Sequence, residues 1–83
     1  ERILKIRELE KMGNNGFAQI FMEAPYRNQK LFETILTTCK NETMLSIAAD
    51  ITLPSESVKT MKISEWRKTL IDLNDKLVVF IIN

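Results

Sequence analysis

The stretch FAQIFMEAPYRN at residues 17–28 decides the fold, because it passes from an apolar run into a polar cluster that opens on a proline. Phe17 to Met22 is nearly continuously apolar and holds aromatic and β-favouring residues, a pattern typical of a strand buried on both faces. Pro25 suits the first position of a helix, where its missing N–H has no helical partner to lose. The stretch therefore predicts a strand that ends at Glu23 and leads directly into a helix.

The residues that follow predict an amphipathic helix and a second buried strand. Met44 to Ala49 is another short apolar run, and it also stops at an acid, Asp50. Between the two strands, apolar side chains recur at helical spacing on one face: Leu31, Phe32, Ile35, Leu36 and Cys39. A strand, a helix and a strand in this order are typical of an α/β domain.

The N-terminal flank predicts a further helix. From Arg2 to Met12, apolar residues recur at three- to five-residue intervals, which places them on one helical face. Gly13 is expected to be the C-cap of this helix. The helix is short, and its apolar stripe needs a partner to cover it.

The C-terminal flank predicts an edge strand, a short helix and a central strand. Residues 58–62 alternate as a short edge strand after the loop that holds Pro54. Ser64 can cap a helix that runs to Leu70, with Trp66 and Leu70 on its inner face. Residues 77–82 form a third apolar run, whose burial implies a central position in the sheet.

Together these elements predict one α/β domain over residues 1–83, a mixed sheet of about four strands with helices packed on its faces. A chain of 83 residues can build one hydrophobic core but not two. Because the chain starts at Glu1 within a helical pattern, we expect that a further segment precedes it.

The composition excludes several kinds of site. Twelve Lys and Arg residues against eleven Asp and Glu leave a net charge of +1, so the basic excess that drives nucleic-acid binding is missing. With no His and with Cys39 as the single cysteine, the chain lacks the commonest general base and any thiolate metal site. Cys39 is expected to be a buried apolar residue, and a lone cysteine favours a reducing, cytoplasmic setting. Residues 77–82 are too short an apolar run to span a membrane.

Two polar clusters lie where ligands bind in open α/β sheets, directly after a strand. The first is residues 23–28, and the second is residues 50–52 with Glu56 nearby. If the two strands are parallel neighbours, both clusters fall on the same edge of the sheet. The alternative interpretation is a helix-start ion pair in the first cluster and turn residues in the second. Tyr26, set among polar residues, could stack on a base or on a ligand ring.

The two clusters resemble a pair of motifs of the tetrapyrrole (corrin/porphyrin) methylase superfamily. Residues 21–27, FMEAPYR, are similar to the FYESPHR motif in the C-terminal domain of these proteins. Residues 47–56, IAADITLPSE, are similar to an alanine, arginine, glutamate, leucine, threonine, lysine block with a glutamate three residues after the lysine. The subfamily that methylates a ribose 2′-hydroxyl of small-subunit ribosomal RNA is the most similar.

The resemblance implies an S-adenosylmethionine-dependent methyltransferase, of which residues 1–83 are the C-terminal domain. It also implies an N-terminal domain with a glycine-rich cofactor loop that is absent from this chain, and a homodimer. Neither the resemblance nor the residues place a catalytic group in the chain. From the resemblance and, for Tyr26, from its polar surroundings, the residues expected at the cofactor or substrate cleft are Glu23, Pro25, Tyr26, Arg27, Ala48, Ala49, Asp50 and Thr52.

The chain departs from the motifs at three positions on the expected RNA side. Tyr26 stands in place of a histidine, Ala49 in place of an arginine and Leu53 in place of a lysine. The methyl acceptor therefore stays open between rRNA ribose and a tetrapyrrole-like small molecule. The alternative from another class is a non-catalytic module that binds a protein or RNA, with the helix stripe of Ile3, Ile6 and Leu9 as its docking face.

Overall fold

The computed structural model describes the backbone of residues 2–51 and 53–83 and the side chains of residues 5–51 and 53–83. Its elements follow in the predicted order, with one 3-10 turn inserted before the second helix. No helix in this part of the chain has the length and apolar character needed to cross a membrane. The elements are α1 (Arg2–Asn14), β1 (Gln19–Met22), η1 (Pro25–Arg27), α2 (Asn28–Thr38), β2 (Met44–Ala49), β3 (Ser57–Lys62), α3 (Ile63–Trp66) and β4 (Val78–Ile82).

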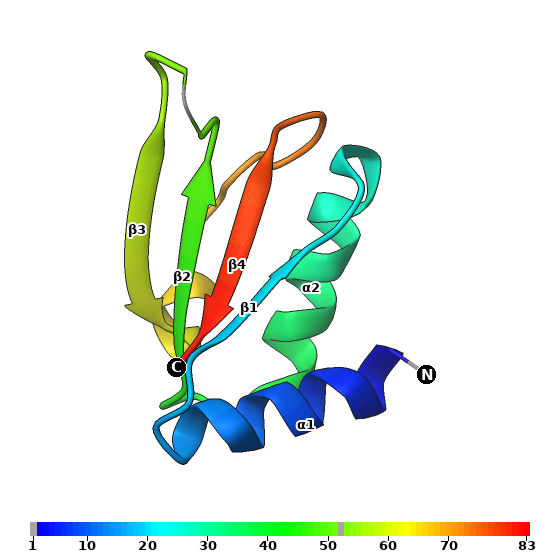
Figure 1. Cartoon of the computed structure of the whole chain (residues 1–83), viewed down its shortest axis with the longest axis vertical. Helices are drawn as coiled ribbons and strands as arrows, with labels where there is room; N and C mark the ends of the chain where they lie inside the picture. The colour runs from blue at the N-terminus through cyan, green and yellow to red at the C-terminus, as the bar shows by residue number, and fades with distance from the viewer. Residues whose placement is uncertain (1, 52) are drawn as a thin grey trace.

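The four strands form one sheet in the order β1-β4-β2-β3. The predicted α/β domain with about four strands is confirmed, but each neighbouring pair is antiparallel, so the sheet is not mixed. The reason is the position of β4, which inserts between β1 and β2 and runs opposite to both. β1 and β2 therefore point in the same direction without being neighbours (Figure 1). The central position predicted for the last strand is confirmed.

One face of the sheet is covered by α2 and α3, which lie behind the strands in Figure 1. The indole of Trp66 is fully buried there, and its Nε1 donates a hydrogen bond to the Leu45 carbonyl oxygen at 2.8 Å. The ring of Phe32 from α2 meets the Trp66 ring edge-on, with centroids 5.7 Å apart. Trp66 thus joins both helices to the sheet, as its predicted role in the core requires.

The opposite face of the sheet is open, and no helix in the described part of the chain covers it (Figure 1). It carries apolar side chains that are largely exposed, including Ile20 at 69%, Met22 at 55% and Val58 at 66%. The prediction that residues 17–22 are buried on both faces is therefore wrong. β1 is an edge strand, and only the side of it that carries Phe21 packs against the core. The expected helices on both faces are likewise found on one.

The end of α1 also differs from the prediction. Gly13 lies within the helix, where a Cβ atom would come 2.9 Å from the Ile82 carbonyl oxygen, so this glycine permits close approach of α1 to β4. The cap is built by Gly16, whose φ of +93° is the left-handed conformation that glycine tolerates. Gly16 N–H donates to the Gly13 carbonyl and Phe17 N–H to the Met12 carbonyl, the bond pattern of a Schellman motif.

The last helix is shorter than predicted. α3 ends at Trp66 and does not reach Leu70, whose side chain is fully exposed at 102%. Ser64 lies inside α3 and does not cap it, and its N–H donates to the Asn41 carbonyl oxygen. One turn is sufficient to bring Trp66 into the core, so nothing requires the helix to continue.

Candidate functional site

The two polar clusters lie at the end of the sheet where β1 and β2 finish, which is at the top of Figure 1. This end of the sheet is here called the edge. They follow Met22 at the end of β1 and Ala49 at the end of β2, and these strands point in the same direction. β4 begins between them at Val78, so residues 71–77, here called the 71–77 loop, separate the clusters. The edge is thus built from three segments, two of which the sequence predicts.

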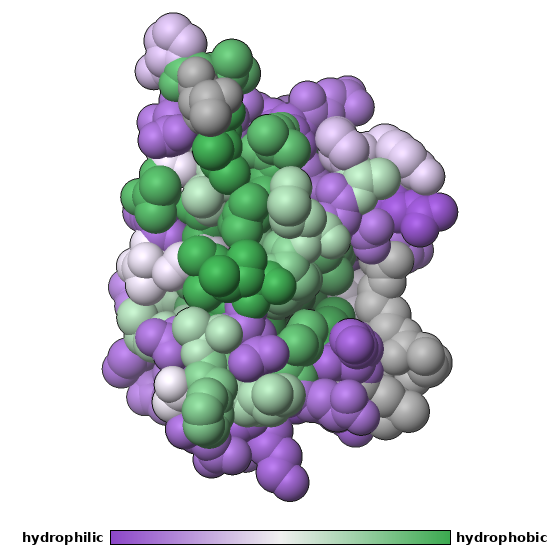
Figure 2. Space-filling model, viewed as in Figure 1, coloured by the Kyte–Doolittle hydropathy of each residue, from purple (hydrophilic) through white to green (hydrophobic). Residues whose placement is uncertain are grey.

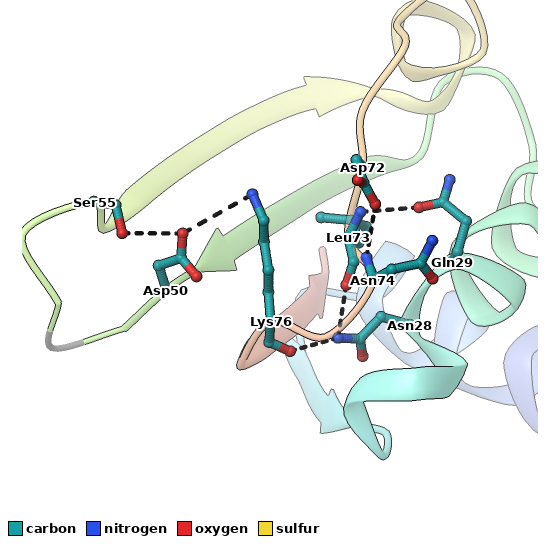
Figure 3. Close-up of polar contacts among 8 residues, drawn as sticks. All are labelled: Asn28, Gln29, Asp50, Ser55, Asp72, Leu73, Asn74 and Lys76. Carbon is teal, nitrogen blue, oxygen red and sulfur yellow. Dashed lines mark hydrogen bonds and ion pairs between the residues drawn. The ribbon is translucent and has the colours of Figure 1, made fainter.

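Asp50 forms the corner of this edge that follows β2. Its N–H donates to the Leu77 carbonyl oxygen at 2.9 Å, and its φ of +54° turns the chain away from the strand. Its Oδ2 accepts a hydrogen bond from the Ser55 hydroxyl at 3.1 Å and lies 4.0 Å from Lys76 Nζ (Figure 3). The Asp50 side chain is only 18% exposed, so its charge is held close to these two partners.

The residues after β1 form the second corner. The Glu23 Oε1 accepts a hydrogen bond from the N–H of Ala24 at 3.1 Å, and the Arg27 N–H donates to the Ala24 carbonyl at 2.8 Å. The Arg27 guanidinium lies 5.3 Å from the centroid of the Tyr26 ring, within reach of a cation–π contact. Tyr26 is 68% exposed, so the stacked ring and cation face the solvent.

The side-chain amides of Asn28 and Gln29 bind the two corners together through the 71–77 loop (Figure 3). Asn28 Nδ2 donates to the carbonyl oxygens of Leu73 at 3.1 Å and Lys76 at 2.7 Å. Gln29 Oε1 accepts from the Leu73 N–H at 2.9 Å, and its Nε2 donates to the Ile71 carbonyl at 3.2 Å. The start of α2 therefore fixes the loop that carries Lys76 to Asp50.

Asn28 is fully buried, although the sequence places it only in the polar cluster of residues 23–28 and not among the expected cleft residues. Its Oδ1 has no hydrogen-bond partner among the described residues. The amide is therefore held by the two hydrogen bonds that its Nδ2 donates to Leu73 and Lys76. A signal for it exists in the sequence. Asn28 precedes Leu31 by three residues and Ile35 by seven, which places it on the apolar face of α2. A polar residue on that face predicts a buried hydrogen-bonded side chain.

The remaining predicted site residues are spread over different surfaces. Ala49 is buried on the covered face, whereas Ala48 alternates to the open face, so their side chains do not line one surface. Pro25 is exposed at the start of η1, and its carbonyl oxygen accepts a hydrogen bond from Asp75 N–H at 3.4 Å. Thr52 lies outside the described residues.

A hollow of about 470 Å³ opens beside β1, between this strand and α1. The volume falls within the range of roughly 300–1,000 Å³ that small-molecule sites occupy. Glu23 borders this hollow, whereas Asp50 contacts Ser55 and Lys76 on the other side of β4. The two acids of the edge therefore have different surroundings. The hollow is lined by Lys5, Ile6, Leu9, Phe21, Met22, Glu23 and Leu31.

Among the described residues, the edge presents polar and charged side chains but no activated nucleophile. Burial, followed by the neighbouring Glu10 carboxylate, raises the pKa of the Cys39 thiol to about 12, so the thiol stays protonated at neutral pH. Cys39 is buried, as predicted. Within residues 5–51 and 53–83, no three acidic or cysteine side chains gather as a metal site would require. The described edge therefore offers carboxylates, hydrogen-bonding groups and the exposed ring of Tyr26.

Comparison with known proteins identifies a solved structure with a similar fold. No protein-family model matches the chain, and no curated protein matches it. Among solved structures, the crystal structure of the methyltransferase CobJ superposes with a TM-score of 0.55 and 15% sequence identity. The match covers 96% of this chain and 34% of the CobJ chain, so the chain spans about a third of the length of that protein. At 15% sequence identity, the superposition shows that this chain and part of CobJ share a fold.

Proposed function

We propose that residues 1–83 are the C-terminal domain of an S-adenosylmethionine-dependent methyltransferase of the tetrapyrrole methylase type. The observation that carries the proposal is that both segments resembling the motifs of that superfamily, residues 21–27 and 47–56, meet one edge of the sheet. The shared fold with part of a methyltransferase supports it. A preceding domain would close over this edge, and cofactor and substrate would lie between the two.

The groups at the edge fit the chemistry of the cofactor. S-adenosylmethionine supplies an electrophilic methyl group on a sulfonium, and it also presents an ammonium, ribose hydroxyls and an adenine ring. Asp50 and Glu23 offer carboxylates for cations or hydroxyls, and the exposed Tyr26 ring offers a surface for stacking. We infer that this chain binds and orients S-adenosylmethionine, while the N-terminal domain supplies the rest of the cofactor site.

Such a role requires no catalytic group among the described residues. Transfer of a methyl group depends mainly on holding the donor and acceptor in line, which can supply much of the rate enhancement. Asn28 and Gln29 would serve as positioning residues, because they fix the 71–77 loop that holds Lys76 against Asp50. The domain would therefore contribute geometry and exclusion of water to the reaction.

The methyl acceptor is proposed to be either an rRNA ribose or a tetrapyrrole-like small molecule. The motif resemblance favours rRNA, because the most similar subfamily methylates that substrate. The exposed groups at the edge favour a flat, apolar acceptor, since Tyr26 and Leu53 stand where the subfamily has protonatable or basic side chains. A transfer assay with radiolabelled S-adenosylmethionine, run on ribosomal subunits and on a porphyrinogen, separates the two.

Calorimetry with S-adenosylmethionine tests the proposal on the polypeptide that joins this domain to its N-terminal partner and on residues 1–83 alone. The two-domain protein is expected to bind, and the isolated domain to bind much more weakly, because one wall of a cleft buries little of the ligand. Absence of binding to the two-domain protein would reject the proposal.

Two pairs of variants locate the site. Arg27→Ala and Asp50→Asn are expected to weaken binding, because both residues lie at the proposed edge. The controls Arg7→Ala and Glu65→Gln remove a like charge from α1 and α3 and should leave binding unchanged. Asparagine tolerates the positive φ of residue 50, so the loss would not come from backbone strain. Equal losses in the controls would place the cofactor elsewhere.

A non-catalytic interaction module is the second candidate, and the open face of the sheet favours it. The docking face that the sequence predicts for this function is the apolar stripe of α1. This prediction is wrong, because Ile6 is buried in the core and Leu9 packs against the core. Ile3 has a side chain outside the described part. The candidate surface is instead the exposed apolar face that includes Ile20 and Val58. A stable complex with an unrelated protein, without cofactor binding, would support this function over the first.

A further inference from the structure

A second hollow, of about 610 Å³, lies between the C-terminal half of α1 and the end of α2. α1 crosses the lower end of the molecule in Figure 1 and α2 ends against it there, whereas the edge is at the upper end. Figure 2 shows hydrophilic residues in purple at this lower end, below the green apolar face of the sheet. The 11 residues of α2 span about 16 Å, so this hollow is distinct from the edge.

The second hollow is rich in positive charge. Arg7 and Lys11 of α1 line it together with Lys40, which lies two residues beyond the end of α2. Glu10 is the one acidic residue among the described residues of its lining. Three positive charges and one negative charge leave +2, whereas the whole chain carries only +1. The basic excess of the chain is therefore concentrated at this place, which is here called the basic hollow.

Glu10 holds the walls of the basic hollow together. It is only 6% exposed, and its Oε2 accepts hydrogen bonds from the Lys40 N–H at 2.5 Å and from the Thr43 hydroxyl at 2.6 Å. Both donors come from the segment after α2, so the two bonds join this segment to α1. The buried carboxylate thus fixes the position of Lys40 relative to α1, and its own hydrogen bonds are made within the protein.

The three cationic side chains that line the basic hollow have no partner among the described residues. None of their head groups forms an ion pair or a hydrogen bond in this part of the chain. Arg7 and Lys11 are also one turn apart on α1, a spacing at which like charges repel one another. An anion bound between them would remove this repulsion.

Stabilisation of the helix ends does not account for these cations. Positive side chains near a helix C-terminus can bind its free carbonyl oxygens. In α2 this role is filled by Arg67, which donates to the carbonyl oxygens of Leu36 at 2.9 Å and Cys39 at 2.8 Å. In α1 the backbone N–H groups of residues 15–17 bind the last carbonyl oxygens. The ammonium groups of Lys11 and Lys40 are therefore available to a ligand.

We propose that the basic hollow binds a phosphomonoester, a phosphate group that is attached to a single organic group. Such a phosphate carries a charge close to −2 at pH 7, because its second pKa is about 6, and this charge matches the +2 of the lining. A phosphodiester of a nucleic-acid backbone carries only one negative charge. The proposal is independent of the proposed methyltransferase function.

The shape and composition of the basic hollow suit this ligand. Guanidinium and ammonium groups are the side chains that commonly bind phosphate in proteins, and Arg7 and Lys40 approach from different segments. The Thr38 hydroxyl and the Asn15 amide, also in the lining, supply neutral donors. The volume lies within the roughly 300–1,000 Å³ of small-molecule sites, so there is room for the organic group as well.

An NMR titration of the ¹⁵N-labelled chain with ribose 5-phosphate tests the proposal. Shift changes are expected at residues 7–15 and 38–43, with a dissociation constant on the order of 1 mM at low salt, because each exposed ion pair contributes little. Ribose, which has no phosphate, should not bind. Dimethyl phosphate, a diester, should bind at least about fivefold more weakly, and lowering the pH to 5 should weaken the monoester similarly by protonating it.

Charge-removing variants locate the phosphate. Lys11→Gln and Lys40→Gln should each raise the dissociation constant about two- to fivefold, and the double variant should abolish measurable binding. The control Lys59→Gln removes an equally exposed lysine from β3 and should leave binding unchanged. All three lysines are exposed, so the variants should fold, which circular dichroism checks.

Four results would overturn the proposal. They are no shift changes at tens of millimolar ribose 5-phosphate, shift changes confined to residues 23–28 and 48–51, equal losses in Lys11→Gln and Lys59→Gln, and equal affinity for the monoester and the diester. The second result would place the phosphate at the edge, and the last would show that the charge of the ligand does not decide binding. The probes contain no adenine and no sulfonium, so none of these results depends on binding of S-adenosylmethionine.

Discussion

The two faces of the sheet are built by the same four strands and have opposite surroundings. On the covered face, Leu45, Phe80 and Ile82 are completely buried beneath α2 and α3. On the open face, Ile20 and Met22 are equally apolar and mostly exposed. Apolar composition alone therefore does not decide burial in this domain. What decides it is whether a helix covers the face.

The largest effect should come from the covered face. Phe80→Ala removes a fully buried ring that stacks on Phe21 at 5.8 Å, and it should lower the free energy of unfolding by about 3–5 kcal/mol. Met22→Ala on the open face should cost less than about 1 kcal/mol. Urea denaturation measures both. Similar losses for the two variants would contradict the distinction between the faces.

The next largest effect should come from the start of α2, beneath the site edge. Asn28→Asp keeps the shape of the side chain but removes the donor that binds Leu73 and Lys76, so two carbonyl oxygens would face a carboxyl group. We expect a loss of about 2–4 kcal/mol, because buried groups would be left unpaired.

Gln29→Glu is the matched control for Asn28→Asp. It keeps the acceptor for Leu73 N–H and loses only the bond to the Ile71 carbonyl, in a partly buried position. Its cost should be about 1 kcal/mol. Thermal and urea denaturation rank the two variants, and a reversed order would show that the buried amide does not hold the 71–77 loop.

A smaller effect is expected from the pH dependence of stability. Burial raises the pKa of Cys39 from its ordinary value of 9.0 to about 12, so the folded chain holds this proton more tightly than the unfolded chain. The stabilisation is complete below pH 9 and is lost as the pH rises toward 12. Denaturation curves at pH 8, 9, 10 and 11 should show a decline that is shallower in Cys39→Ala. Parallel declines in both proteins would disprove this contribution.

The smallest effect should come from the hydroxyl pair on the open face. Ser46→Ala removes the hydrogen bond to Thr60 from a solvent-exposed position. The free energy of unfolding should fall by about 0.5–1 kcal/mol, because water can replace the lost partner. Urea denaturation measures the change, and a loss as large as that of Asn28→Asp would contradict the distinction between an exposed and a buried hydrogen bond.

The sequence predicts the second strand and the helix before it well, because their apolar positions have a clear period. Met44 to Ala49 is β2 with no change of bounds, and Leu31, Phe32 and Ile35 are buried as their spacing indicates. The predicted burial of the first strand on both faces is wrong, because a continuous apolar run does not reveal whether both faces of the sheet are covered. The predicted length of α3 is wrong for a related reason. Leu70 has the helical spacing of a core residue, but its side chain is fully exposed and does not contact the core.

The candidate site is predictable only in part. Glu23 and Asp50 could be placed at strand ends from the sequence, and one shared edge follows once β1 and β2 point in the same direction. The contribution of the 71–77 loop could not be predicted, because its bond to Asn28 joins residues 45 positions apart. Such a contact depends on where β4 enters the sheet, and no local pattern encodes that.

The most direct test of the proposed cofactor edge is an NMR titration of the ¹⁵N-labelled chain with S-adenosylmethionine. We expect shift changes at residues 23–28, 48–51 and 72–77, where the three segments of the edge meet, even if binding is weak. Amides of α3 and of β3 should stay unchanged and serve as internal controls. Shift changes confined to α3 and β3, or none at millimolar cofactor, would contradict the assignment of this edge to the methyltransferase cleft.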